Sequence, residues 1–279
     1  MSSDSERQSS VAAGSNSGRL RIALRDVSKT FRFGETSLTA VESFSLDIYE
    51  GEFVCLLGPS GSGKSTVLNM TAGLLGASAG SVVVDGKTVS LNNFPDKIGY
   101  VFQRDTTYPW RTVWQNIGLG LELQGLRKDG RAERIVKAIK AARLEGFEDA
   151  FPTMLSGGMR QRVSLMRTLV MEPEILLMDE PFGALDAHTK LEMQRLLLEI
   201  WERQRQTVIF VTHDLAEALT LADRIVLLSA RPGRFKQEFR VSFPRPRDAV
   251  RLRASHEYAE LFSQIWNSLG EEIEKLNPQ

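Results

Sequence analysis

The chain has 279 residues, with 35 Lys and Arg against 35 Asp and Glu, so its formal net charge is zero. A balanced surface offers no general electrostatic footprint for DNA or RNA, and we expect no nucleic-acid partner. The single cysteine excludes an internal disulfide framework, and no apolar run reaches about eighteen residues, so we expect a cytoplasmic protein that does not cross a membrane by itself.

Residues 1–18 are rich in Ser, Gly and charged side chains and lack the apolar stretch of a signal peptide, which predicts a disordered tail. Apolar and polar residues then alternate over residues 20–46, as in half-exposed antiparallel strands, and residues 81–87 and 98–102 add further strands. A small antiparallel sheet is therefore predicted beside the core. Cys55 falls in an apolar strand at residues 53–57 and is predicted to be buried.

A glycine-rich loop with the pattern G-x-x-x-x-G-K-[ST] follows that strand and precedes a helix-compatible segment at residues 67–75. It consists of Gly58, Pro59, Ser60, Gly61, Ser62, Gly63, Lys64, Ser65 and Thr66. Glycines let the backbone direct N–H groups at phosphate oxygens, and the helix N-terminus faces the same anion. Lys64 is expected to reach the β- and γ-phosphates, Ser65 to ligate Mg²⁺, and Thr66 to support the first helical turn. The alternative is a Gly/Ser-rich turn that happens to precede a lysine, but the strand and helix on either side favour the phosphate loop.

The pattern changes to helix between about residues 104 and 155, with apolar positions three and four apart, which indicates a helical insertion. Helix at residues 161–171, strand at 175–178, helix at 190–201 and strand at 207–211 then follow. Alternating strands and helices predict an α/β fold whose mostly parallel sheet is covered on both faces.

Two adjacent acids, Asp179 and Glu180, stand where the apolar strand at residues 175–178 ends, and ligands of open α/β sheets bind at that end. Asp179 is expected to hold the Mg²⁺ shell. Glu180 is expected to polarise the water that attacks the γ-phosphate.

The C-terminal part contains a turn at residues 230–234 and a basic, proline-punctuated stretch at residues 243–247, which we interpret as a solvated surface rather than a lipid-binding segment. Residues 251–279 form a predicted amphipathic helix. One face carries Tyr258, Leu261, Phe262, Ile265, Trp266, Leu269 and Ile273. We expect this face to contact its own domain, although an exposed apolar stripe could also dock a partner.

Residues 155–163, Leu-Ser-Gly-Gly-Met-Arg-Gln-Arg-Val, resemble the signature motif of the ATP-binding cassette family, and residues 20–229 follow that family's order of motifs. The resemblance implies a P-loop NTPase core with a mostly parallel sheet, an N-terminal antiparallel β-subdomain and a helical insertion at about residues 104–160, within an ATPase domain at residues 19–250. Ser156, Gly157 and Gly158 open a helix and form a second phosphate site. In the family, two cassettes pair head to tail, and each signature covers the ATP held by the other.

Other positions carry over from the family residue by residue. Gln103 resembles the glutamine that senses Mg²⁺ and the attacking water, Asp186 ends the loop that couples the two sites, and His213 resembles the histidine that contacts the γ-phosphate. Phe31 resembles the aromatic residue that stacks on adenine, although Phe33 or an ordinary strand role stays open. His188 and His256 have no comparable context.

Residues 155–201, together with residues 229–234 and 243–247, resemble ATP-binding subunits of bacterial importers for nitrate, taurine and aliphatic sulfonates. This resemblance implies an ATPase at the cytoplasmic face of the inner membrane, which powers a multispanning permease and, indirectly, a solute-binding protein. The alternatives are another importer, a two-component exporter, or a soluble cassette ATPase that remodels a macromolecule. Tyr108 and Trp110 are predicted to contact the permease, whereas Trp114 is predicted to hold the insertion on the core.

Overall fold

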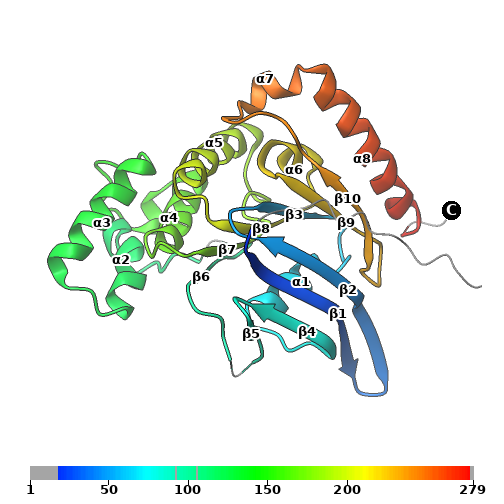
Figure 1. Cartoon of the computed structure of the whole chain (residues 1–279). Helices are drawn as coiled ribbons and strands as arrows, with labels where there is room; N and C mark the ends of the chain where they lie inside the picture. Colours follow the sequence, from blue (N-terminus) through cyan, green and yellow to red (C-terminus); the bar gives the residue numbers. More distant parts are fainter. Residues whose placement is uncertain (1–17, 92, 105, 277–279) are drawn as a thin grey trace, which may run out of the picture.

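The computed structural model describes residues 18–91, 93–104 and 106–276, so all but the last residue of the predicted disordered tail lies outside the described residues (Figure 1). Within the described ranges the strands are β1 (Leu20–Phe33), β2 (Thr36–Tyr49), β3 (Phe53–Leu57), β4 (Ala79–Val84), β5 (Lys87–Thr88), β6 (Ile98–Val101), β7 (Ile175–Asp179), β8 (Thr207–Thr212), β9 (Arg224–Leu228) and β10 (Phe235–Arg240). The helices are α1 (Lys64–Thr71), α2 (Val113–Leu123), α3 (Lys128–Ala141), η1 (Pro152–Met154), α4 (Gly157–Leu169), α5 (Ala187–Gln204), α6 (Leu215–Leu221), α7 (Ala249–Arg253) and α8 (His256–Glu274).

The larger sheet has the strand order β10-β9-β3-β8-β7-β6, with parallel pairing throughout except for the antiparallel edge strand β10. Every residue of β3 and β8 is buried, which explains why these segments read as continuous apolar runs instead of alternating ones. The predicted α/β fold with a mostly parallel sheet is confirmed.

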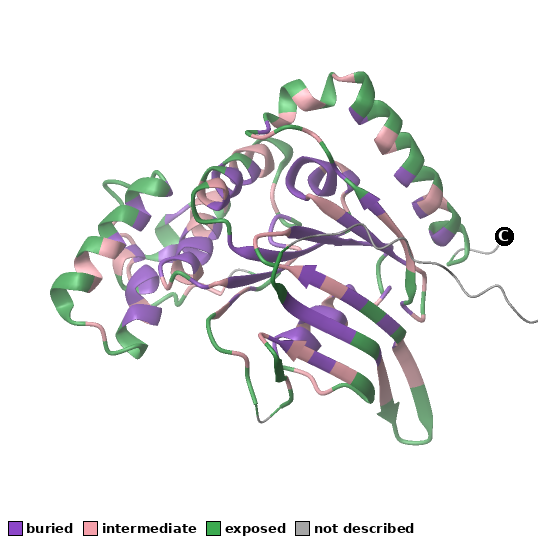
Figure 2. Ribbon diagram, in the orientation of Figure 1, coloured by how far each residue is buried: buried purple, intermediate pink, exposed green. Residues whose placement is uncertain are grey.

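The two faces of the larger sheet belong to different parts of the core. Val54 and Leu56 of β3 face a cluster that includes α1 and the antiparallel strands β1, β2 and β4. Phe53, Cys55 and Leu57 face the opposite way, toward α4, α5 and α6. Figure 2 shows the buried residues concentrated along the strands between these layers. Cys55 is fully buried, as predicted.

The smaller sheet has the order β2-β1-β4-β5 and is antiparallel, as the alternating pattern predicts. Two details of the prediction are wrong. Residues 98–101 form β6, which belongs to the edge of the larger sheet and pairs parallel with β7, not to the antiparallel sheet. In addition, residues 81–87 do not form a single strand. Asp85 and Gly86 have φ angles of 50° and 76°, and this left-handed turn reverses the chain between β4 and β5. An Asp-Gly pair is a typical turn signal, since both residue types tolerate positive φ.

Helices α2 and α3 lie beside the larger sheet, next to α4 (Figure 1). The first of them begins with a capping box: the Thr112 side chain accepts from the backbone N–H of Gln115, and the Gln115 side chain accepts from the backbone N–H of Thr112. Ile117 and Leu121 of α2 and Ile139 of α3 are buried in the same cluster as α4. The insertion therefore shares its core with the helix that carries the signature residues.

The basic stretch at residues 243–247 is not a solvated surface, so that prediction is wrong. Arg247 is 8% exposed and donates hydrogen bonds to the carbonyl oxygens of Ala222 at 2.6 Å and Val241 at 3.1 Å. The Arg245 guanidinium lies 4.2 Å from the Trp201 ring centroid and is paired with Asp223 at 2.6 Å. Arg247 is buried and Arg245 half-buried, because backbone carbonyls and Asp223 supply acceptors for their guanidinium groups. The local sequence does not reveal these distant acceptors.

At the C-terminal end, α8 follows α7 after an N-cap at Ser255 and contacts α6. Tyr258, Ile265 and Leu269 are buried against the core, so the helix packs on its own domain as predicted, whereas Trp266 remains 52% exposed. Strand β10 was not predicted from the sequence, because its short, largely polar sequence has no clear periodicity. The single helix predicted at residues 251–279 is wrong in its bounds, since α7 ends at Arg253 and α8 begins only at His256, after the Ser255 N-cap, and ends at Glu274. Residues 277–279 of that prediction lie outside the described residues.

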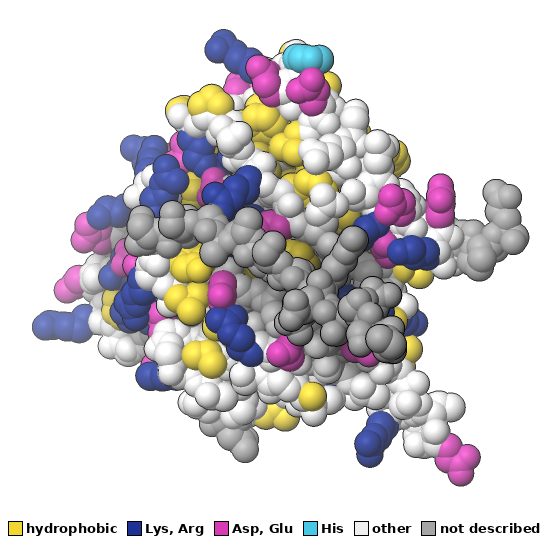
Figure 3. Space-filling model, turned by 45° about the vertical axis from the view of Figure 1, so that its right-hand side comes forward, with side chains coloured by type: hydrophobic (Ala, Val, Ile, Leu, Met, Phe, Trp, Pro, Cys, Tyr) yellow, Lys and Arg dark blue, Asp and Glu magenta, His cyan; other side chains and the backbone are white. Residues whose placement is uncertain are grey.

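Among the described residues, no helix has the length and apolar character needed to cross a bilayer. On the face of the molecule drawn in Figure 3, Lys and Arg side chains lie among Asp and Glu side chains. This mixed pattern agrees with the balanced charge of the sequence.

Candidate active site

The phosphate loop joins β3 to the N-terminus of α1. Gly61 and Gly63 have φ angles of 77° and 84°, in the left-handed region that favours glycine. A Cβ atom on Gly63 would lie 2.7 Å from both the Ala40 carbonyl oxygen and Cγ2 of Val41. Glycine is therefore required at this position both for backbone conformation and for the close approach of β2.

Lys64 is the first residue of α1 and is only 4% exposed. Its ammonium donates to the carbonyl oxygens of Gly58 and Pro59, each at 2.9 Å. Burial lowers the pKa of Lys64, and the nearby charge of Glu180 opposes this effect. The lysine thus places a positive charge inside the loop, where a phosphate group would need it.

Ser65 and Asp179 join the loop to the end of β7. The Ser65 hydroxyl donates to Oδ1 of Asp179 at 2.7 Å. Burial raises the pKa of Asp179, while the hydrogen bond from Ser65 lowers it. Mg²⁺ prefers oxygen donors and is usually held by one or two carboxylates together with substrate phosphates. The hydroxyl and carboxylate at this position fit that donor set.

Glu180 lies at the centre of a second cluster, formed where β6, β7 and β8 end side by side. Its carboxylate accepts from Nε2 of Gln103 at 3.2 Å and lies 3.1 Å from Nδ1 of His213. The Glu180 backbone has a φ of 42° and donates to the carbonyl oxygen of Val211 at 3.0 Å. A positive φ is costly for a non-glycine residue. Here it redirects the chain after Asp179, so that both acids reach the same edge of the sheet.

A cavity of about 680 Å³ connects the phosphate loop to the Glu180 cluster, whereas Asp179 is not part of its lining. Its lining includes the phosphate loop except Ser62, together with Gln103, Glu180 and His213. It also includes residues that were not predicted as part of the site, although Leu269 and Ile273 belong to the predicted apolar face of the C-terminal helix; these residues are Leu38, Ala40, Arg231, Leu269, Ile273 and Leu276. These six come from β2, the loop after β9 and the C-terminal end of the chain, and no local motif marks them.

Some predicted site residues lie outside this cavity. Phe31 is partly buried on β1 opposite Leu38, and its ring lies 6.5 Å from that of Phe33. Neither ring is part of the cavity lining. Placing an adenine stacking partner at Phe31 therefore stays a prediction.

The signature residues and Asp186 also lie outside the cavity, and both segments begin helices. The Ser156 hydroxyl accepts from the Met159 backbone N–H at 3.3 Å at the start of α4, and Ser156 and Gly157 are exposed. Asp186 accepts from the backbone N–H groups of His188 and Thr189 at 3.1 Å, and hydrogen bonds from Thr189 lower its pKa. Its carboxylate is used as the N-cap of α5.

In the aromatic segment at residues 108–114, two rings lie at the surface and one packs on the core, as the sequence suggested. Trp110 is 70% exposed and Tyr108 is 38% exposed, with ring centroids 5.3 Å apart, whereas Trp114 packs against the core. The Asn116 side chain fixes this segment by hydrogen bonds to both the N–H and the carbonyl oxygen of Tyr108. This segment thus presents two aromatic rings at the surface. Their contact with a permease stays a prediction.

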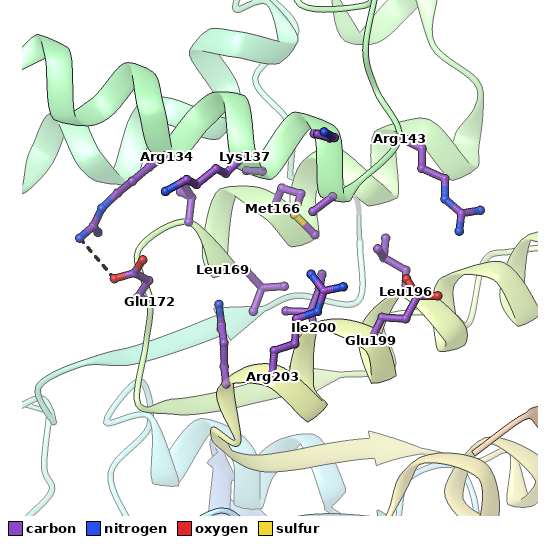
Figure 4. A pocket seen from close by; sticks show the side chains of 15 residues that line it. Arg134, Lys137, Arg143, Met166, Leu169, Glu172, Leu196, Glu199, Ile200 and Arg203 are labelled. Carbon is purple, nitrogen blue, oxygen red and sulfur yellow. Dashed lines mark ion pairs between the residues drawn. The ribbon is translucent and has the colours of Figure 1, made fainter. Parts of the chain in front are cut away.

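A second cavity of about 560 Å³ lies between α3, α4 and α5 (Figure 4). Met166, Leu169 and Ile200 contribute apolar side chains, and Arg134 pairs with Glu172 at 3.2 Å on one side. No residue of the phosphate loop lines it. This groove is therefore separate from the phosphate-binding chemistry.

Comparisons with known proteins agree with the geometry. Residues 41–183 match the family model described as ABC transporter. An uncharacterized ABC transporter ATP-binding protein of Methanocaldococcus jannaschii is 46% identical over 92% of this chain and 94% of its own. A taurine import ATP-binding protein of Rhizobium johnstonii is 44% identical over 84% of this chain and 90% of its own.

An aliphatic sulfonates import ATP-binding protein of Bacillus cereus is 39% identical over 88% of this chain and 94% of its own. Among solved structures, a dimeric ATP-binding cassette in a post-hydrolysis state with ADP and Pi bound is 35% identical. It superposes with a TM-score of 0.70 over 80% of this chain and 100% of its own.

Proposed function

The chain belongs to the ABC transporter family as the ATP-hydrolysing subunit of an importer, and from this premise we propose which of its residues act on ATP and which assembly they serve. The ATPase domain comprises residues 19–250, with the helical insertion at about residues 104–160. The proposal is supported most directly by the Glu180 carboxylate, which Gln103 and His213 hold at the edge of the cavity that contains the phosphate loop.

Binding of ATP is assigned to the loop at residues 58–66. Its backbone N–H groups and the N-terminus of α1 favour an anion, and Lys64 adds a full charge. Ser65 and Asp179 would hold Mg²⁺, which neutralises phosphate charge when bound. The 2.7 Å hydrogen bond from the Ser65 hydroxyl to the Asp179 carboxylate keeps these two oxygen donors next to each other.

Hydrolysis is assigned to Glu180. Its carboxylate orients a water molecule for attack on the γ-phosphorus and accepts the proton as the new P–O bond forms and the bond to ADP breaks. Gln103 and His213 keep the carboxylate in position, since each has a nitrogen within 3.2 Å of its Oε2 atom. The chemistry thus depends mainly on positioning and charge.

The active unit is a head-to-tail dimer of this chain. Ser156, Gly157 and Gly158 form a helix N-terminus with the backbone N–H groups of an anion site, and the first two are exposed, yet none of the three lines the cavity of its own subunit. In a head-to-tail pair they would cover the γ-phosphate bound by the other copy, with Asp186 in the loop between the two sites. The dimeric cassette structure with ADP and Pi supports this arrangement.

The assembly is a permease complex at the cytoplasmic face of the membrane, with a solute-binding protein as an indirect partner. The solute is a small anion or organic solute of the nitrate, sulfonate or taurine type. Relatives named for taurine and aliphatic sulfonate import support the sulfonate and taurine part of this assignment. Growth of a deletion strain on taurine, an alkanesulfonate or nitrate as the sole sulfur or nitrogen source tests this assignment. Normal growth on all three would contradict it.

Glu180→Gln tests the catalytic assignment. Glutamine keeps the shape and hydrogen-bonding capacity of the side chain but removes the carboxylate, so we expect steady-state ATPase activity to fall by about a hundredfold or more while ATP still binds. Glu145→Gln, at an exposed position in the insertion, is the matched control. Near-normal turnover in Glu180→Gln would remove Glu180 from the catalytic role.

A further inference from the structure

The C-terminal end of the chain forms one wall of the nucleotide cavity. Leu269 and Ile273 of α8 and the following Leu276 line it, and Leu38 and Ala40 of β2 contribute further apolar side chains to the same lining. Figure 1 shows α8 running down beside the edge strand β10, and the Lys236 ammonium and Gln237 side chain of β10 hydrogen-bond to Ser268 of α8. These five side chains are all apolar, so they offer a surface for a flat base but no hydrogen-bond partners that would read its edge.

Arg231 reaches the same cavity from the loop between β9 and β10. A Cβ atom on Gly61 of the phosphate loop would lie 2.8 Å from Nη2 of Arg231. Arg231 is exposed, and within the described part of the chain its guanidinium has neither an ion pair nor a hydrogen bond. An unpaired guanidinium beside a phosphate-binding loop can donate hydrogen bonds to phosphate oxygens.

The loop that carries Arg231 is fixed in place. Gly233 donates to the carbonyl oxygen of Ala40 at 2.9 Å and accepts from the Glu42 N–H at 3.0 Å. A Cβ atom on Gly233 would lie only 2.0 Å from the Ser62 carbonyl oxygen, so this loop contacts the phosphate loop backbone directly. Arg231 is thus held beside the phosphate loop by the backbone on either side of it.

Glu272 connects the loop to α8. It is 1% exposed, accepts from the Ala230 N–H at 2.8 Å, and pairs with Lys236 at 2.8 Å. Ala230 immediately precedes Arg231, and Glu272 immediately precedes Ile273. The Glu272–Ala230 hydrogen bond therefore joins the loop that carries Arg231 to the part of α8 that carries the apolar cavity residues.

We propose that Arg231 and α8 are part of the nucleotide-binding site, where Arg231 contacts the phosphate chain and Ile273, with Leu269 and Leu276, covers the base and ribose. This inference rests on the proposed function, because it requires ATP to bind in this cavity. The apolar wall favours a nucleoside triphosphate over a bare polyphosphate and discriminates little between purine bases.

Competition against a fluorescent ATP analogue tests both contacts in the full chain, with ATP and inorganic tripolyphosphate as competitors in the presence of Mg²⁺. The variants are Arg231→Ala and Ile273→Ala. Their matched controls are Arg234→Ala, in the same loop as Arg231 but paired with Glu42 of β2, and Trp266→Ala, an exposed α8 position outside the cavity lining. Lys64→Ala serves as the reference for the phosphate loop, and thermal melting checks that each variant folds.

Arg231→Ala is expected to weaken both ATP and tripolyphosphate about tenfold, since it removes a charge-assisted contact to phosphate. By contrast, Ile273→Ala should weaken ATP about threefold and leave tripolyphosphate unchanged, because only the nucleoside meets the apolar wall. This inference is wrong, and the proposed function stands, if the folded Arg231 and Ile273 variants bind both competitors as tightly as their controls while Lys64→Ala binds both more weakly. Tighter ATP binding by Ile273→Ala would make α8 an obstruction and would also overturn it. Normal binding by Lys64→Ala would instead contradict the proposed function itself.

Discussion

Glu272 should stabilise the C-terminal helix through its charge, and Glu272→Gln isolates that charge. The carboxylate is almost fully buried and contacts the ammonium groups of Lys236 at 2.8 Å and Lys275 at 2.6 Å. Burial alone would raise the pKa of Glu272. Hydrogen bonds from Lys236, Lys275 and the Ala230 N–H outweigh burial and lower the pKa from 4.5 to about 2.

The size of the effect follows from this difference in pKa. A fall from 4.5 to about 2 corresponds to an upper limit of about 3 kcal/mol in the free energy of unfolding. Lys275 is 62% exposed, so water screens part of the interaction and we expect about 1–2 kcal/mol. A glutamine at this position keeps the shape and can still accept from the Ala230 N–H. Its cost should therefore be mainly that of the lost charge.

The sign of the pH dependence is fixed by the lowered pKa. The folded state favours the ionised carboxylate, so the stabilisation is fully present above pH 4.5 and is lost as the pH falls toward about 2. The difference in unfolding free energy between the wild type and Glu272→Gln should therefore be largest at pH 7. We expect it to fall to less than half of that value by about pH 3.

Urea unfolding of the full chain, followed by tryptophan fluorescence at several pH values, measures this difference. Glu274→Gln, an exposed position on the same helix, is the matched control and should change stability by less than about 0.5 kcal/mol. If Glu272→Gln is as stable as the wild type at pH 7, or if its deficit does not shrink on acidification, the ionised carboxylate does not stabilise the helix.

Two further predictions concern assembly. Mixing Ser156→Arg chains with Lys64→Ala chains should restore part of the ATPase activity that each variant lacks alone. The reason is that one of the two sites in the heterodimer then carries neither defect. No recovery of activity, with heterodimers shown to form, would contradict the head-to-tail pairing. Trp110→Ala should leave the isolated subunit folded and hydrolysing ATP, because the side chain is 70% exposed, yet weaken co-purification with the permease and abolish solute-stimulated turnover. Loss of folding with normal assembly would instead place Trp110 in the core.

The buried strands and the main catalytic cluster could be predicted from the sequence because local patterns determine them. Continuous apolar runs of five residues at 53–57 and 207–211 indicate strands in a sheet covered on both faces, and β3 and β8 occupy those positions. The strands are parallel, so residues just after them meet at one edge. Gln103, Glu180 and His213 lie within hydrogen-bonding distance there although they are far apart in the sequence.

The C-terminal contributions to the site could not be predicted, since they depend on contacts between distant segments. The apolar stripe of α8 indicates a buried face, and Tyr258 and Ile265 are indeed buried, but the stripe does not reveal that Ile273 continues beyond the core into the nucleotide cavity. That position depends on how α8 crosses α6 and on the contact of Glu272 with Ala230. Neither has a local sequence signal.

Arg231 and Arg245 illustrate the same limit most clearly, because each precedes a proline in a basic segment after β9. Arg245 lies against the Trp201 ring and pairs with Asp223, so its charge is used within the fold. Arg231 has no acceptor among the described residues and lies beside Gly61. Similar sequence contexts thus give a structural cation in one case and a free cation in the other. The two arginines differ in whether a distant segment supplies a hydrogen-bond acceptor for the guanidinium. The Arg231 guanidinium has none among the described residues and lies beside the phosphate loop, so it is available to bind a ligand.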